Sequence, residues 1–340
     1  MAGALQQPGP IAEVTLSPGQ PIDDALLHAD TPWIARGLVS DWPATQAGAE
    51  GGHEFFAYLQ SFSAGRPTSA FIAEPEHEGR LFYNEQFDGF NFVQLDTTLE
   101  AVFSKLLKLK EEASAPTLYV GSTPVSTALP GFQAENNLDM ASAEPLVSIW
   151  LGNRCRVAAH FDYPRNLACC IAGRRRFTVF PPEQVANLYI GPWDLTPAGQ
   201  PISLVDTQAP DLDRFPRFTT AWASAQSAEL EAGDVIYMPG MWWHQVESLE
   251  PINALVNYWW SETPAVYGAP MDAFDHALLA LKQLPAEQKR AWKALFDQYV
   301  SNEDKDALAH LPEHSKGRLA PLQSDLARRL RADLINRLKR

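Results

Sequence analysis

The feature that most constrains the fold is a series of short apolar runs between residues 117 and 262. These runs are rich in Val, Ile, Phe, Tyr and Trp, and Gly, Pro and Asn residues separate them. Several short strands with such punctuation are typical of a β-sandwich or barrel. The predicted strands are Thr117–Gly121, Leu146–Leu151, Leu167–Ala172, Arg176–Phe180, Asp234–Met238 and Ala254–Trp260.

The segments around these strands follow other patterns. Apolar residues at helical spacing predict helices over residues 53–62, 97–112, 271–300 and 322–340, the last with leucines four apart. Residues 1–20 are expected to form a loose leader. Residues 191–227 contain many turn-forming residues and are expected to form a long insertion between two hairpins. We therefore expect a β-rich domain over residues 1–268 with an N-terminal α/β elaboration, followed by a helical segment over residues 269–340.

The charge balance limits the classes of partner. The 340 residues include 27 Lys and Arg against 41 Asp and Glu, a net charge of −14. Phosphate contacts need clustered cations, so we expect no binding to nucleic acid. No apolar run approaches 18 residues and the N-terminus does not resemble a signal peptide, so no membrane association is expected. The three cysteines form no disulfide framework, which favours the cytoplasm.

One set of residues has the spacing of a metal site. His160 and Asp162 are two apart, so on a strand both would face the same way, and His244 would join them from a later strand. Two imidazoles and one carboxylate on one face of a metal form the facial triad of non-haem Fe(II) oxygenases, which leaves positions open. The alternative is a chance H-x-D pair and a hydrogen-bonded core histidine.

A second signal is the basic run Arg174–Arg176, which separates two predicted strands. Strand alternation turns Arg175 to the same side as Phe177, and an arginine inside a barrel is costly unless an anion meets it. Its planar fork suits the distal carboxylate of a dicarboxylic co-substrate. The alternative is an exposed hairpin with solvated charges. Asn166 and Asn257, also on predicted strands, either orient ligands or bond to the backbone.

The aromatic stretch over residues 81–92 allows two interpretations. Tyr83, Asn84 and Phe90 are candidates for contact with a substrate at the mouth of a pocket. The alternative is a loop whose aromatic side chains pack against the barrel, as loop aromatics often do.

Taken together, these motifs carry a resemblance that spans most of the chain. The chain resembles the JmjC/cupin-like hydroxylase family, which includes bacterial cupin-like proteins and the asparaginyl hydroxylase acting on hypoxia-inducible factor. The segments that carry the resemblance are Trp33–Pro43, His160–Asp162 with Asn166, Phe177–Pro182, Gly233–Pro239, Trp242–His244, Val256–Trp259 and the helical tail.

The resemblance implies a double-stranded β-helix, or jelly roll, that uses Fe(II), 2-oxoglutarate and O2. It implies that His160, Asp162 and His244 hold the iron. It also implies that four further residues contact 2-oxoglutarate, namely Arg175, Tyr119, Asn166 and Asn257. Relatives usually have a lysine at position 175, and at position 157 often a threonine where this chain has Val157.

Three functions follow from these signals. The first is an Fe(II)- and 2-oxoglutarate-dependent dioxygenase that hydroxylates a protein side chain or a small molecule. The others are a cupin-type metalloprotein that does not use 2-oxoglutarate and a non-catalytic, metal-containing binding module. Related hydroxylases dimerise through C-terminal helices, and the leucine seam of residues 322–340 needs burial, so a homodimer is expected.

Overall fold

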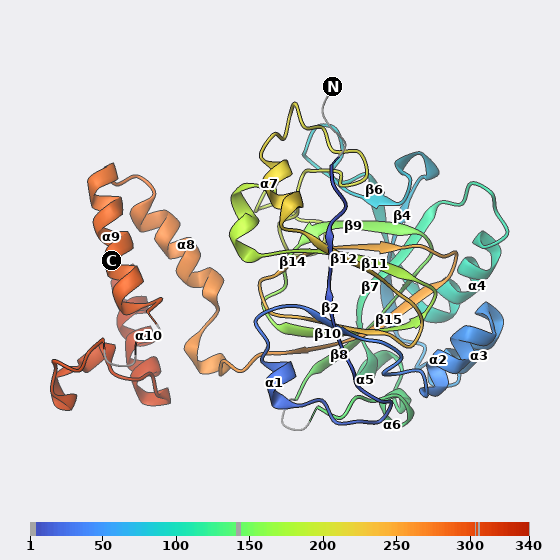
Figure 1. Cartoon of the computed structure of the whole chain (residues 1–340), viewed down its shortest axis with the longest axis horizontal. Helices are drawn as coiled ribbons and strands as arrows, with labels where there is room; N and C mark the ends of the chain where they lie inside the picture. Colours follow the sequence, from blue (N-terminus) through green and yellow to red (C-terminus); the bar gives the residue numbers. More distant parts are fainter. Residues whose placement is uncertain (1–4, 141–143, 303, 305–306, 340) are drawn as a thin grey trace. The chain divides into compact units, whose positions relative to one another are not determined.

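The computed structural model describes residues 5–140, 144–302, 304 and 307–339. It divides the chain into two units, residues 1–261 and 262–340, of which the first contains the β-sheets and the second is helical (Figure 1). From the sequence we expected this division after residue 268, whereas in the structure the first unit ends with Ser261.

The strands of the described residues form two sheets. The strand order is β1-β12-β11-β14-β9-β5 in the six-stranded sheet and β2-β3-β13-β10-β15-β8-β7-β4-β6 in the nine-stranded sheet. Their bounds are β1 Gly9–Pro10, β2 Ala12–Val14, β3 Trp33–Ala35, β4 Pro67–Ala73, β5 Arg80–Leu81, β6 Phe92–Thr98, β7 Thr117–Pro124, β8 Leu146–Gly152, β9 Cys155–His160, β10 Arg165–Ala172, β11 Arg175–Phe180, β12 Gln226–Leu230, β13 Val235–Met238, β14 Trp243–Ser248 and β15 Asn253–Trp260.

From β8 to β15 the chain passes repeatedly between the two sheets. Strands β8, β10, β13 and β15 lie in the nine-stranded sheet and β9, β11, β12 and β14 in the six-stranded sheet. A core cluster takes residues from both, including Ala168, Phe177, Leu230, Ile236 and Leu255. The predicted mainly-β, double-stranded β-helix with flanking helices is therefore confirmed.

The expected loose leader is wrong for residues 9–14. Strand β1 pairs in parallel with β12, strand β2 pairs in parallel with β3, and Ile11 between them is buried. These pairs involve only two or three residues each, too few for a periodic sequence signal. The N-terminal segment thus adds one strand to each sheet.

The helices of the described residues lie outside the two sheets. Helices α2, α3 and α4 contribute Ala44, Phe55 and Leu106 to a core cluster shared with the nine-stranded sheet. The bounds are α1 Asp24–Leu27, α2 Pro43–Glu50, α3 Gly52–Gln60, η1 Pro75–His77, α4 Leu99–Leu109, α5 Val125–Ala128, α6 Phe132–Glu135, η2 Pro182–Ala186, α7 Phe218–Ala223, η3 Ala265–Tyr267, α8 Pro270–Leu281, α9 Ala286–Tyr299, η4 Glu313–Ser315, η5 Gly317–Leu319 and α10 Ser324–Leu338.

The chain between β11 and β12 runs from residue 181 to residue 225 and contains η2 and α7. Phe215 and Phe218 of this insertion pack in one cluster with Phe180 and Trp243 of the six-stranded sheet. A single bridge between Ile190 and Ser203 closes part of the insertion on itself. The predicted insertion therefore is an ordered cover anchored to that sheet by aromatic side chains.

In the second unit, α10 and the residues just before it contact the segment that precedes α8. Arg331 Nη2 donates to the carbonyl of Val266 at 2.6 Å, and the Tyr267 hydroxyl donates to the carbonyl of Leu322 at 2.8 Å. Helices α8 and α9 contain no buried residue, and Leu279 is 77% exposed. No helix among the described residues has both the length and the apolar character needed to cross a membrane.

Helix α2 approaches the nine-stranded sheet through Gly48. A Cβ on this residue would lie 2.4 Å from the Ile171 carbonyl oxygen in β10. Gly48→Ala should therefore lower the free energy of unfolding by about 1–3 kcal/mol, because the backbone of a packed strand yields little. Gln46→Ala on the exposed side of α2 should change it by less than about 0.5 kcal/mol. Urea denaturation checks both values; equal stabilities would contradict the close packing.

Candidate metal and co-substrate site

The three predicted metal ligands converge on one point. His160 ends β9, Asp162 follows two residues later, and His244 lies on β14 directly opposite His160 in the strand pairing. Nitrogen and carboxylate oxygen atoms of all three lie within 4.8 Å of one another. The His244 Nε2 to Asp162 Oδ2 distance is 3.5 Å, and the two imidazole centroids are 4.4 Å apart.

Backbone carbonyls fix which nitrogen of each imidazole faces the site. His160 Nδ1 lies 2.9 Å from the carbonyl of Ala158, and His244 Nδ1 lies 2.9 Å from the carbonyl of Trp242. A carbonyl can only accept, so each Nδ1 carries the proton and donates it. Each Nε2 then presents a lone pair, as a metal-ligating histidine with a fixed tautomer does.

The turn before β14 fixes the position of Asp162. The Met241 backbone N–H donates to the Asp162 carbonyl at 2.7 Å, and Met241 has a φ of 68°. A Cβ on Gly240 would lie 2.5 Å from the Tyr163 carbonyl oxygen, so glycine permits the close approach of these two loops. The loop after β9 and the turn before β14 thus form one rigid support for the carboxylate.

The electrostatics of the site favour a neutral imidazole beside an ionised carboxylate. Burial, and then the neighbouring His244, lower the pKa of His160 to about 4. Burial acts to raise the pKa of Asp162, but the two neighbouring histidines, His244 foremost, outweigh it and lower that pKa. A free Nε2 lone pair and a carboxylate are the forms that bind a divalent metal.

Among the described residues, no carboxylate forms an ion pair with the buried cation of Arg175. Arg175 begins β11 and is 3% exposed, and its Nε and Nη2 atoms have no hydrogen-bond partner among the described residues. Its neighbours differ, because Arg174 pairs with Glu229 and Glu250 at the surface. The solvated-hairpin alternative thus describes Arg174, whereas Arg175 lines the same cavity as the metal ligands.

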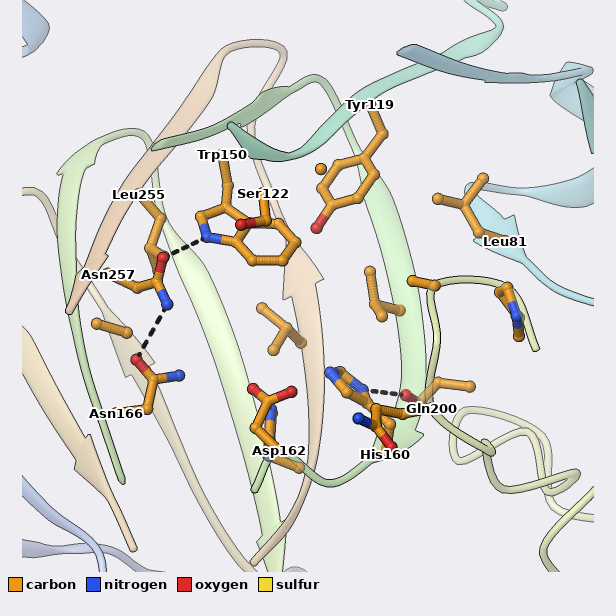
Figure 2. A pocket seen from close by; sticks show the side chains of 18 of the residues that line it. Leu81, Tyr119, Ser122, Trp150, His160, Asp162, Asn166, Gln200, Leu255 and Asn257 are labelled. Atoms are coloured by element: carbon orange, nitrogen blue, oxygen red, sulfur yellow. Dashed lines mark hydrogen bonds and ion pairs between the residues drawn. The ribbon is translucent and has the colours of Figure 1, made fainter. Parts of the chain in front are cut away.

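A chain of hydrogen bonds forms the wall from the nine-stranded sheet. Trp150 Nε1 donates to Asn257 Oδ1 at 2.7 Å, and Asn257 Nδ2 donates to Asn166 Oδ1 at 3.5 Å (Figure 2). No hydrogen bond from Asn166 Nδ2 occurs among the described residues, so this amide can donate to a ligand. Tyr119 also points its hydroxyl into the cavity, and burial raises the pKa of this phenol, so that the group remains a donor.

These groups share one cavity of about 500 Å³. All seven predicted site residues line it, and Val157 lines it as well. Sequence reasoning missed Trp150, Ser122 and Gln200, which Figure 2 also places around the cavity. The strand pattern around Trp150 could have indicated its direction, whereas nothing in the sequence marks Gln200, which belongs to the insertion between β11 and β12.

The aromatic stretch over residues 81–92 lies beside this cavity. Leu81 and Phe92 at its ends line the cavity, but Tyr83, Asn84 and Phe90 do not. Tyr83 is buried, and its hydroxyl donates to the carbonyl of Leu195 in the insertion at 2.9 Å. The interpretation as a loop packed through its aromatics therefore holds, and direct contact of these three residues with a substrate in the cavity does not follow.

Comparisons with known proteins agree with this geometry. Lysine-specific demethylase JMJ31 of Arabidopsis thaliana is 31% identical over 115 residues, 34% of this chain and 20% of that protein. HSPB1-associated protein 1 of Homo sapiens is 35% identical over 116 residues, 33% and 23% of the two chains. tRNA wybutosine-synthesizing protein 5 of Gallus gallus is 30% identical over 145 residues, 38% and 42%.

The matched segments thus cover a fifth to two fifths of these relatives' length. A family model described as a Cupin-like domain matches residues 20–266, which include every strand from β3 to β15 and all seven residues of the site. The chain therefore belongs to the Cupin-like domain family, of the JmjC type.

Proposed function

We propose that this protein is an Fe(II)- and 2-oxoglutarate-dependent dioxygenase that hydroxylates a protein side chain or a small molecule. The observation that carries the proposal is that one cavity contains both a His-Asp-His triad and the buried cation of Arg175, which pairs with no described carboxylate. The first group suits a metal with open positions, and the second requires an anion. A dicarboxylic co-substrate that reaches both satisfies the two requirements at once.

His160, Asp162 and His244 would hold the iron through two Nε2 atoms and a carboxylate oxygen. Bound there with 2-oxoglutarate, the iron supplies activation of dioxygen and oxidation of a C–H bond. The protein fixes the ligand directions through the carbonyls of Ala158 and Trp242, which leave neither imidazole free to turn.

Arg175 would bind the distal carboxylate of 2-oxoglutarate, and Tyr119 would donate its phenol proton to the same group. The guanidinium offers a planar pair of donors, and no described carboxylate competes for it. Asn166 and Asn257 would orient the co-substrate through the amide chain that begins at Trp150. Val157 offers no hydroxyl, so the charge of Arg175 carries more of the binding.

The cavity wall limits access of water to the reacting groups. Phe71, Phe92 and Trp150 line one side, and Ile202 of the insertion lines another. An apolar lining strengthens the electrostatic interactions inside the cavity and excludes side reactions with solvent. This arrangement favours catalysis over a non-catalytic, metal-containing binding module.

We also propose that the protein acts in the cytoplasm and on a substrate other than nucleic acid. Its three cysteines are buried and unpaired, which suits a reducing compartment. The unit that contains the cavity, residues 1–261, has 14 Lys and Arg against 30 Asp and Glu. Such an excess of acidic groups repels a phosphate backbone.

The triad can be tested by metal binding. His160→Ala, Asp162→Ala and His244→Ala should each weaken Mn(II) binding, used in place of Fe(II), by about 100-fold or more, because each removes one of three ligands. Isothermal titration calorimetry of the full chain measures the affinity. His77→Ala in η1, away from the cavity, serves as the control and should bind Mn(II) like wild type. Unchanged binding in the triad variants would refute the metal site.

The role of Arg175 can be tested by co-substrate turnover. Arg175→Met should raise the KM for 2-oxoglutarate by about 30-fold or more, since a charge-assisted pair contributes about 2 kcal/mol. Arg174→Met, the matched surface control, should leave this KM unchanged. Succinate formed under Fe(II) and oxygen is the readout. If wild type forms none, the alternatives without 2-oxoglutarate replace this proposal.

A homodimer through the C-terminal helices is a further part of the proposal. Leu279 and Leu295 are 77% and 47% exposed on α8 and α9, two helices that bury no residue within the chain. Such apolar surface is typical of a subunit interface. Leu279→Glu with Leu295→Glu should convert a dimer into a monomer in sedimentation analysis, whereas Gln288→Glu on α9 should not. A monomeric wild type would contradict this prediction.

A further inference from the structure

The sheet edges of the first unit differ greatly in length. Among the described residues, three of the four outermost strands, β1, β2 and β5, have only two or three residues. The fourth, β6, has seven residues and ends the nine-stranded sheet beyond β4. Its outer side therefore presents a row of backbone N–H and C=O groups that no described strand pairs with.

Apart from the single charge of Asp96, strand β6 also lacks the features that normally protect such an edge. Its sequence contains no Pro, Lys or Arg, and its pairing with β4 runs without a bulge. Two of its large apolar side chains face solvent, Val93 at 58% and Leu95 at 45% exposure. Sheet proteins usually block long edges with lysine, proline or irregular pairing. An edge left open and apolar in this way is suited to bind another strand.

The strand is continuous with the wall of the cavity. In the β4–β6 pairing, Phe71 lies opposite Gln94 and Ala73 opposite Phe92, so these residues share one face of the sheet. Phe71 and Phe92 line the cavity, as does Ser69, which accepts a hydrogen bond from Gln94 Nε2 at 3.0 Å. A strand added to β6 would turn alternate side chains to the cavity face.

The chain segment that contains β6 is acidic. Residues 74–100 contain seven Asp and Glu and one Arg. Glu76, Glu78 and Glu85 line one surface hollow, in which Arg80 and Arg156 are both paired with Asp206. The four carboxylates of the hollow, Asp206 included, therefore outnumber its two guanidinium groups, and a positively charged segment complements the negative charge that remains.

We propose that β6 binds an extended, positively charged segment of a protein substrate as an added strand and thereby directs one of its side chains into the cavity. Main-chain hydrogen bonds along the edge would supply affinity, and the cavity and acidic residues would select the sequence. This inference rests on the proposed function, whose substrate class it narrows to a peptide.

The test uses full-length protein loaded with Mn(II) and random dodecapeptides displayed on phage. Selected peptides should carry net positive charge. After synthesis with a fluorescent label, they should bind Leu95→Lys about tenfold or more weakly than wild type, because lysine at an edge blocks strand addition. Val185→Lys serves as the control: it adds the same charge at a similarly exposed apolar residue of η2. Fluorescence anisotropy measures both affinities, and circular dichroism checks the fold.

A second measurement separates strand pairing from charge. Only alternate residues of an added strand donate to β6, so N-methylation of one alternate set of peptide amides should abolish binding and methylation of the other set should not. Equal effects of the two sets, failure to select any peptide, or equal binding to the two lysine variants would overturn the proposal.

Two controls separate peptide binding from self-association of the chain and from the proposed function. If Leu95→Lys lowers the sedimentation coefficient of the free protein, β6 pairs with a second copy of the chain, and the proposal is overturned. Succinate formation without a peptide should be the same in Leu95→Lys and wild type. If wild type forms succinate but binds no peptide, this inference alone fails; if it forms none, the proposed function fails whatever the peptide result.

Discussion

The site depends on one irregularity in the pairing of β14 with β9. Val246 lies opposite Val157, yet His244 lies opposite His160, so β9 uses one more residue than β14 over this interval. In a regular ladder His244 would face Ala159, and His160 would point to the opposite side of the sheet. This extra residue makes a β-bulge in β9, and the bulge turns His160 toward His244. Without this extra residue, two histidines on neighbouring strands could not share a metal.

The bulge explains how far sequence reasoning could go. The H-x-D spacing and the later His244 predicted that these three side chains share one site, and the structure places them within 4.8 Å of one another. Their exact alignment depends on a pairing irregularity between strands that are distant in the chain, which no local pattern encodes. The strands Leu146–Leu151 and Leu167–Ala172 were predictable, since buried strands carry long apolar runs.

Other parts of the structure carry too little local signal. Strands β1 and β2 gain their stability from partners that are distant in the sequence, so the N-terminal segment was expected to be loose. For the arginine run, alternation gave the directions of the side chains but not their environments. Glu229 and Glu250 neutralise Arg174 at the surface, whereas Arg175 faces a cavity, and only the folded sheet distinguishes the two.

The insertion between β11 and β12 helps to shape the cavity but contributes none of the three predicted metal ligands. It leaves the six-stranded sheet after Phe180 and brings Gln200 to the cavity (Figure 2), while the three predicted metal ligands stay on β9, β14 and the loop after β9. Changes in the length or sequence of this insertion can alter the shape of the cavity without shifting the pairing of β9 with β14. The same three predicted metal ligands can thus be combined with differently shaped cavities during evolution by changes in this one insertion.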